Sequence, residues 1–100
     1  MLDADVYICA NDQMAMGAYN ELTNLGYKIP DDCLLTGFDD ITQAKYNLPS
    51  ITSVERREDY IGLTAFNKLM ALSKGEKTED EVVKAIPQFR KSCCKDYKVI

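Results

Sequence analysis

The first part of the chain has the pattern of a strand that runs directly into a helix. Residues 3–10 end in an apolar run that stops at Asn11 and Asp12. From Asp12 onward, apolar residues recur at spacings of three and four, which predicts a helix with one buried face. Asn11 or Asp12 supplies the N-cap, and Gly26 is positioned to end the helix. The face consists of Met14, Ala15, Ala18, Tyr19, Leu22 and Leu25.

A second apolar run at residues 33–38 follows a turn at residues 29–32. The run is continuous rather than alternating, which is typical of a parallel strand that is buried on both faces. A strand, a helix and a second strand in succession predict a βαβ unit with a right-handed crossover. The carboxyl ends of both strands then meet at one edge of the sheet.

The second half of the chain is dominated by one long helix, which begins at Glu58 or Asp59 and ends near Ser73. Its apolar stripe consists of Ile61, Ala65, Phe66, Leu69 and Leu72. The other expected elements are a short helix at 41–46, a break at 48–50, an extended segment at 51–54, an acidic loop at 77–81, and a strand pair at 82–86 and 88–92 or one strand broken at Pro87.

The expected elements form an α/β domain that is too thin to cover both faces of its sheet. We therefore interpret the chain as a fragment of a larger protein. Its parts are a βαβ unit with a crossing segment (4–54), a long helix (55–75), a returning strand (76–93) and a tail without a clear pattern (94–100).

Composition excludes several classes of function. A chain of 100 residues with a net charge of −4 is not expected to grip a phosphate backbone by itself. The absence of histidine excludes a histidine-based catalytic triad and a histidine-containing zinc site. No apolar run is long enough to cross a membrane, and the first residues do not resemble a signal peptide. We expect no metal and no cofactor.

The four cysteines do not suggest a disulfide framework. Cys9 lies near the end of one predicted strand and Cys33 at the start of its parallel neighbour, so the strand rise separates them. Cys93 and Cys94 are adjacent, which suits neither an ordinary disulfide nor a zinc site. We interpret Cys9 and Cys33 as small core residues and expect a reducing compartment.

Asn11 and Asp39 follow the two predicted parallel strands, so both are expected at the edge where ligand crevices open. An amide and a carboxylate offer donors and acceptors to the hydroxyl groups of a ring. Asn11 can instead serve as a helix cap, and Asp39 as a loop carboxylate. Asp12 and Asp40 are assigned mainly to caps and turns. Adjacent Asp39 and Asp40 point differently, so the carboxylate pair of a glycosidase is not expected.

Six motifs in order resemble the effector-sensing domain of the LacI/GalR family of transcriptional regulators. They include Ala10-Asn-Asp-Gln-Met-Ala15 and Gly37-Phe-Asp-Asp40. The full set lies at residues 8–18, 26–32, 35–40, 49–54, 61–65 and 90–93. The turn Ile29-Pro-Asp-Asp32 before the second strand favours the regulator branch over the transport branch of the fold.

The resemblance implies a periplasmic-binding-protein-like (Rossmann-like) sandwich, with a parallel sheet, flanking helices and two lobes that close over a small molecule. The chain matches about the last third of such a sensor. Residues 52–55 correspond to a hinge crossing, and the helix from Glu58 corresponds to one that packs in the other lobe. The DNA-binding module of the family is expected outside this chain.

The resemblance also assigns roles to individual residues. Asn11 and Asp39 match positions that contact the effector. Arg56 stands where the family often has glutamine, so it is a candidate to pair with a carboxylate or phosphate of the effector. The alternative for Arg56 is a solvated charge. Met16 and Tyr46 match positions near the subunit contact, and the alternative for them is core packing.

The resulting hypothesis is the ligand-sensing part of a cytoplasmic, homo-oligomeric regulator. It binds a small sugar-like effector that allosterically controls DNA binding, and it is not an enzyme. The alternatives are an extracytoplasmic sugar-binding protein, the same sensor fused to another output module, and, in a different class, a small enzyme. The sequence leaves the identity of the effector open.

Overall fold

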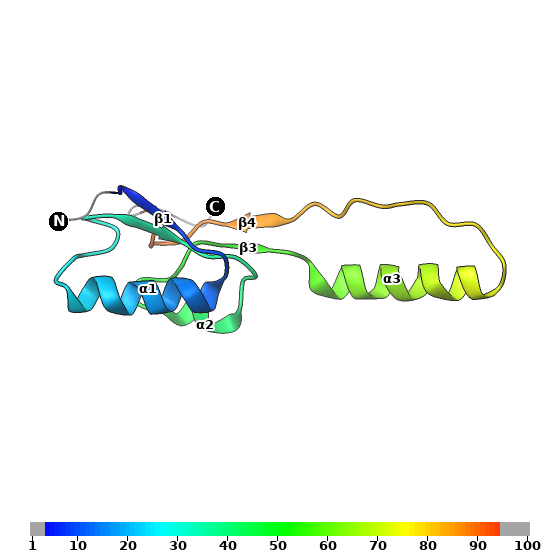
Figure 1. Cartoon of the computed structure of the whole chain (residues 1–100), viewed down its shortest axis with the longest axis horizontal. Coiled ribbons are helices and arrows are strands. Elements are labelled where there is room, and N and C mark those ends of the chain that lie inside the picture. The colour runs from blue at the N-terminus through cyan, green and yellow to red at the C-terminus, as the bar shows by residue number, and fades with distance from the viewer. Residues whose placement is uncertain (1–3, 95–100) are drawn as a thin grey trace.

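The computed structural model describes residues 4–94 and has a compact part and a protruding arm (Figure 1). The elements are β1 (Val6–Ile8), α1 (Asp12–Asn24), β2 (Leu34–Thr36), α2 (Thr42–Tyr46), β3 (Ser53–Glu55), α3 (Glu58–Ser73) and β4 (Ile86–Gln88). Both main helices lie where the sequence predicts them. Within residues 4–94, no helix is both long and apolar enough to cross a membrane.

The compact part is the predicted parallel βαβ unit. β1 pairs with β2 in parallel, and the register places Ile8 beside Thr36. A parallel bridge between Thr36 and Thr52 adds the crossing segment to the far side of β2. α1 and α2 lie on the same side of these strands (Figure 1). The buried core consists of Ala15, Leu22, Ile29, Cys33, Leu35, Ala44 and Ile51.

The ends of α1 follow from local chemistry. Asn11 is the N-cap, and its Oδ1 accepts the backbone N–H of Met14 at 2.8 Å. Gly26 follows the helix with φ +93°, a conformation that glycine adopts without the steric penalty of a side chain. The sequence left the cap open between Asn11 and Asp12, and the structure assigns it to Asn11. Asp12 thereby remains available for contacts outside the helix.

The arm consists of the β3–β4 ribbon, α3 and the segment that returns alongside α3 (Figure 1). The molecule measures 60 × 28 × 21 Å, and its radius of gyration is 17.8 Å, against about 13 Å for a compact domain of this length. No residue of α3 is buried. The expected stripe is exposed along its length, which the missing partner layer explains.

The predicted strand or strand pair near the C-terminal end is wrong in detail. β4 has three residues and runs through Pro87 instead of breaking there. It pairs antiparallel with β3, and Pro87 lies opposite Val54. β4 lies at the edge of a two-stranded sheet, where the missing N–H of proline is tolerated. Residues 82–85 extend along the arm without joining a sheet. Of the predicted tail, residues 95–100 lie outside the described part.

Candidate functional site

Asn11 and Asp39 lie at the same edge of the parallel strand pair. Each comes three residues after a residue of the paired positions Ile8 and Thr36. The backbone N–H of Asp12 donates to the carbonyl oxygen of Phe38 at 2.9 Å, which joins the two junctions directly. The predicted parallel geometry is therefore present at this edge.

An open cleft of about 570 Å³ lies next to this edge, between the β2–α2 junction and the start of α3. Residues 39–43 and 55–60 line it, and Asn11 is not among them. Its charged lining consists of Asp39, Asp40, Glu55, Arg56, Arg57, Glu58 and Asp59. Carboxylates outnumber guanidinium groups in this lining, so the cleft disfavours anions unless an arginine is released to meet them.

Arg56 pairs with two carboxylates at the cleft. Its Nε lies 3.0 Å from Oδ1 of Asp39, and its Nη2 lies 2.8 Å from Oε1 of Glu58. The hydrogen bond to Glu58 and the charge of Asp39 raise the pKa of Arg56 above its ordinary value. The guanidinium of Arg56 is thus fully charged and already paired with two carboxylates. This arrangement resembles the alternative that the sequence offered for Arg56, a surface charge among acidic residues. The ion pair also orients the carboxylate of Asp39.

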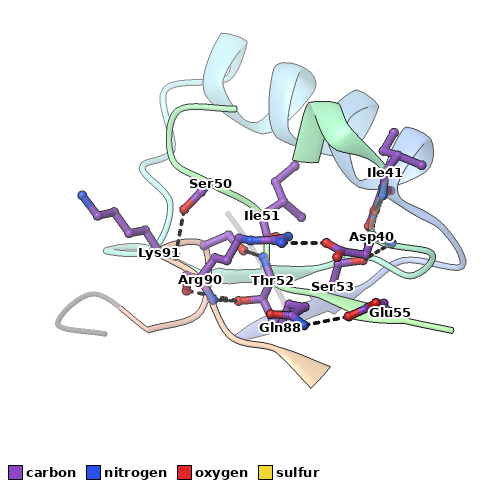
Figure 2. Close-up of polar contacts among 12 residues, drawn as sticks. Asp40, Ile41, Ser50, Ile51, Thr52, Ser53, Glu55, Gln88, Arg90 and Lys91 are labelled. Atoms are coloured by element: carbon purple, nitrogen blue, oxygen red, sulfur yellow. Dashed lines mark hydrogen bonds and ion pairs between the residues drawn. The ribbon is translucent and has the colours of Figure 1, made fainter. Parts of the chain in front are cut away.

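The adjacent residues Asp39 and Asp40 point to different partners, as the sequence suggests. Both have positive φ, +105° and +57°, which is uncommon for residues other than glycine. This turn sends Asp39 toward Arg56, whereas Oδ1 of Asp40 lies 2.7 Å from Nη2 of Arg90. Figure 2 shows the Arg90 side chain pointing toward Asp40. The second ion pair is mostly shielded from solvent.

A buried hydrogen-bond network fixes the base of the site. The carboxylate of Asp12 accepts the backbone N–H of Ile41 at 2.8 Å and the hydroxyl of Ser53 at 2.6 Å. The Ser53 hydroxyl in turn accepts the backbone N–H of Asp40 at 2.9 Å. Asp12 therefore ties Ile41, the residue before α2, to β3 instead of capping its own helix, which differs from the capping role that the sequence indicates.

Residues 90–92, which follow β4, also hold the crossing segment (residues 51–54) in place. The backbone N–H of Arg90 donates to Oγ1 of Thr52 at 2.7 Å, and Nη1 of Arg90 donates to the carbonyl of Ile51 at 2.9 Å (Figure 2). The hydroxyl of Ser92 accepts the N–H of Thr52 at 2.8 Å and donates to the carbonyl of Leu35. Residues 90–92 thus complete the compact part.

Sequence patterns missed the roles of Ser53 and Arg90. Both lie inside motifs that the sequence singled out, at residues 49–54 and 90–93. Neither residue belongs to a periodic apolar pattern or to a predicted helix cap, so local pattern did not predict its contacts. The motifs themselves are the only signal that could have found them.

Met16 and Tyr46 differ in exposure. Met16 is partly buried and packs against the core, which agrees with the alternative of core packing. Tyr46 is 72% exposed at the end of α2, and Leu48 beside it is also exposed. Within residues 4–94, no group of three or more Cys, Asp or Glu side chains is arranged to hold a metal ion.

The sequence of this chain matches a known protein family and resembles known members of it. Residues 5–93 match the model of the periplasmic binding protein-like domain. The HTH-type transcriptional repressor PurR of Escherichia coli O1:K1 is 32% identical over 81 residues, which cover 81% of this chain and 24% of that protein. The chain thus spans about a quarter of the length of the curated relatives it matches.

Solved structures agree with the sequence match. The lac repressor dimer bound to operator and the anti-inducer ONPF superposes with a TM-score of 0.84 at 27% identity, over 89% of this chain and 32% of that one. The complex of the transcriptional regulator CelR with cellobiose gives a TM-score of 0.84 at 30% identity, over 90% of this chain and 28% of that one. The fold is therefore that of LacI-type sensors.

Proposed function

The chain belongs to the periplasmic binding protein-like family, as part of the effector-binding domain of a LacI/GalR-type regulator, and we propose that it senses a small sugar-like effector. The proposal rests on one observation above all. Asp39 stands at the edge of the parallel strand pair, at the rim of a 570 Å³ cleft, with its carboxylate oriented by Arg56.

In this proposal Asn11, which lies at the same sheet edge but outside the lining of the cleft, supplies the second ligand contact. Its Oδ1 is used by the N-cap bond to Met14, and its Nδ2 group has no hydrogen-bond partner among residues 4–94. Capping fixes the rotamer, so the amide can donate to a ligand hydroxyl at little entropic cost. The capping and ligand roles of Asn11 are therefore compatible.

The ion pair between Arg56 and Asp39 decides which kind of effector the site favours. A neutral sugar hydroxyl can donate to Asp39 and accept from Arg56 without breaking the ion pair. An acidic effector would have to displace Asp39 or Glu58 from Arg56. The carboxylate-rich lining therefore favours a neutral polyhydroxylated effector, and the CelR complex, which contains cellobiose, supports the same class.

Control of DNA binding follows from closure of the cleft. An effector that contacts this chain and a second lobe of the whole protein stabilises the closed state by its differential affinity for the two states. In this proposal, the regulator acts in the cytoplasm as a homodimer through the surface near Met16 and Tyr46. DNA contact is made by another part of the protein, and no catalysis is involved.

The test is calorimetric titration of the whole regulator with neutral sugars, the matching sugar acids and nucleosides. We expect one neutral sugar to bind, Asn11→Ala and Asp39→Asn to weaken it at least tenfold, and the controls Asn20→Ala and Asp80→Asn to leave it unchanged. If a sugar binds with the same affinity after both site substitutions, the assignment of the site is wrong.

A further inference from the structure

Two cysteines outside the effector cleft lie with their thiol groups together. Sγ of Cys93 and Sγ of Cys94 are 3.3 Å apart, and both side chains are partly buried. All the cysteines of the described part are free thiols. The cleft and its ligand residues make no use of this pair.

The backbone and Thr52 hold the pair in place. The N–H groups of Cys93 and Cys94 both donate to the carbonyl oxygen of Arg90, at 3.3 and 3.0 Å. Sγ of Cys93 lies 2.8 Å from Oγ1 of Thr52, on the crossing segment. A site whose ligands are already oriented loses little conformational entropy when it binds.

The separation of the sulfur atoms selects the chemistry. It is too long for a disulfide, whose bond is about 2.05 Å, and neighbouring Cα atoms are closer than ordinary disulfides require. Two sulfur bonds of about 2.3 Å, a length typical of thiolate–metal bonds, span about 3.3 Å when they meet near a right angle at one atom. Linear two-coordination would need a wider pair, and a closed tetrahedral zinc site would need further ligands.

Trivalent arsenic is thiophilic and pyramidal, with bond angles close to a right angle. We propose that Cys93 and Cys94 form a bidentate binding site for a monosubstituted trivalent arsenical. Two S–H bonds and the As=O bond break, two As–S bonds form, and the oxygen leaves as water with both thiol protons. Arsenic keeps its oxidation state, so the step needs no oxidant.

The thiols are suited to this exchange rather than to oxidation. The hydrogen bond with Cys93 and partial burial raise the pKa of Cys94 above its ordinary value. A protonated thiol reacts slowly with peroxides, so the pair stays reduced, and the condensation releases both thiol protons in the water that it forms. Cys9 and Cys33 offer no comparable pair among the described residues, since Cys33 is buried.

The test treats the full chain, fully reduced, with one equivalent of phenylarsine oxide and measures its intact mass. We expect one phenylarsenic group per chain, with the loss of two hydrogens. The adduct survives excess glutathione, a monothiol, and is removed by dithiothreitol, a dithiol. Release by glutathione would overturn the proposal.

Variants and peptide mapping locate the site. Cys93→Ser and Cys94→Ser should each abolish the glutathione-resistant adduct, whereas the controls Cys9→Ser and Cys33→Ser retain it. Tryptic digestion of the unsubstituted adduct should place the arsenic on the peptide of residues 92–95, which does not depend on how well any variant folds. Arsenic on another peptide, or a resistant adduct in either site variant, would contradict the assignment.

Discussion

The hydroxyl of Ser53 donates a 2.6 Å hydrogen bond to the carboxylate of Asp12, a residue that lies 41 positions earlier in the chain. Both side chains are buried. Through this bond the start of β3 is tied to the start of α1, and the same hydroxyl accepts the N–H of Asp40. Ser53 therefore helps to fix the relative position of the two sides of the cleft, together with the Arg56–Asp39 ion pair and the hydrogen bond from the N–H of Asp39 to the carbonyl oxygen of Val54.

Replacing Ser53 with alanine should reduce the free energy of unfolding by about 1–3 kcal/mol, because a buried carboxylate loses a donor and a partly buried N–H loses its acceptor. Urea denaturation measures the change. Ser73→Ala is the matched control, since that hydroxyl bonds to Met70 at an exposed helix end and should contribute less than about 0.5 kcal/mol. Equal effects of the two substitutions would refute the network's importance.

Gly37 and Gly17 should respond to alanine with opposite signs. A Cβ on Gly37 would lie 2.1 Å from Oδ1 of Asp12, whereas a Cβ on Gly17 meets nothing within 4 Å. Gly37→Ala should therefore unfold the compact part or destabilise it more than Ser53→Ala does. Gly17→Ala, inside α1, should stabilise the chain by about 0.5–1 kcal/mol. Thermal unfolding followed by circular dichroism distinguishes the two, and a tolerated Gly37→Ala would count against the observed packing.

The two arginine–aspartate pairs should differ in their contribution to stability. In the Arg90–Asp40 pair the side chains are 15% and 18% exposed, whereas in the Arg56–Asp39 pair they are 47% and 31% exposed. Arg90→Gln leaves a shielded carboxylate without its cation and should cost about 2–4 kcal/mol. Arg56→Gln should cost clearly less, because solvent screens this exposed pair. Urea denaturation at low and high salt provides the comparison, and a reversed order would contradict it.

The exposed stripe of α3 should make the isolated 100-residue chain associate with itself. Ile61, Phe66, Leu69 and Leu72 are all exposed on a helix that no other layer covers, and patches of this kind favour association or swapping. Light scattering after size-exclusion chromatography should show an oligomer, and Phe66→Glu with Leu69→Glu should shift it toward monomer.

Asn67→Glu, on a different side of the same helix, is the control for the added charge. This variant should remain oligomeric, because Asn67 lies in the hollow that faces the return segment. A monomeric unchanged chain at the same concentration would show that the stripe does not drive association.

Cys33 should be the slowest native thiol to react with iodoacetamide. Burial, followed by the charge of Asp32, raises its pKa above the ordinary value. A raised pKa lowers the thiolate fraction at every pH below it, so alkylation stays slow at neutral pH and rises only in more alkaline solution. Mass spectrometry of the native and urea-unfolded chain measures the difference. Equal native and unfolded rates at Cys33 would contradict its burial.

Local pattern was enough to predict α1, α3 and the parallel pairing of β1 with β2. Helical spacing marks where each helix lies, and Gly26 marks the end of α1, because these features depend on residues a few positions apart. The succession of strand, helix and strand then limits the topology to a parallel pair. This pairing also placed Asn11 and Asp39 at one edge of the sheet. Motif order added the family, and with it the expectation that these two residues contact the effector.

Tertiary structure alone decided the pairing of Asp12 with Ser53 and of Asp40 with Arg90, and the passage of β4 through Pro87. These contacts join residues tens of positions apart. Periodicity reports which face of an element is buried, but it carries no information on which distant group will meet a buried carboxylate. These partners are determined only when residues 90–92 pack against the crossing segment at residues 51–54.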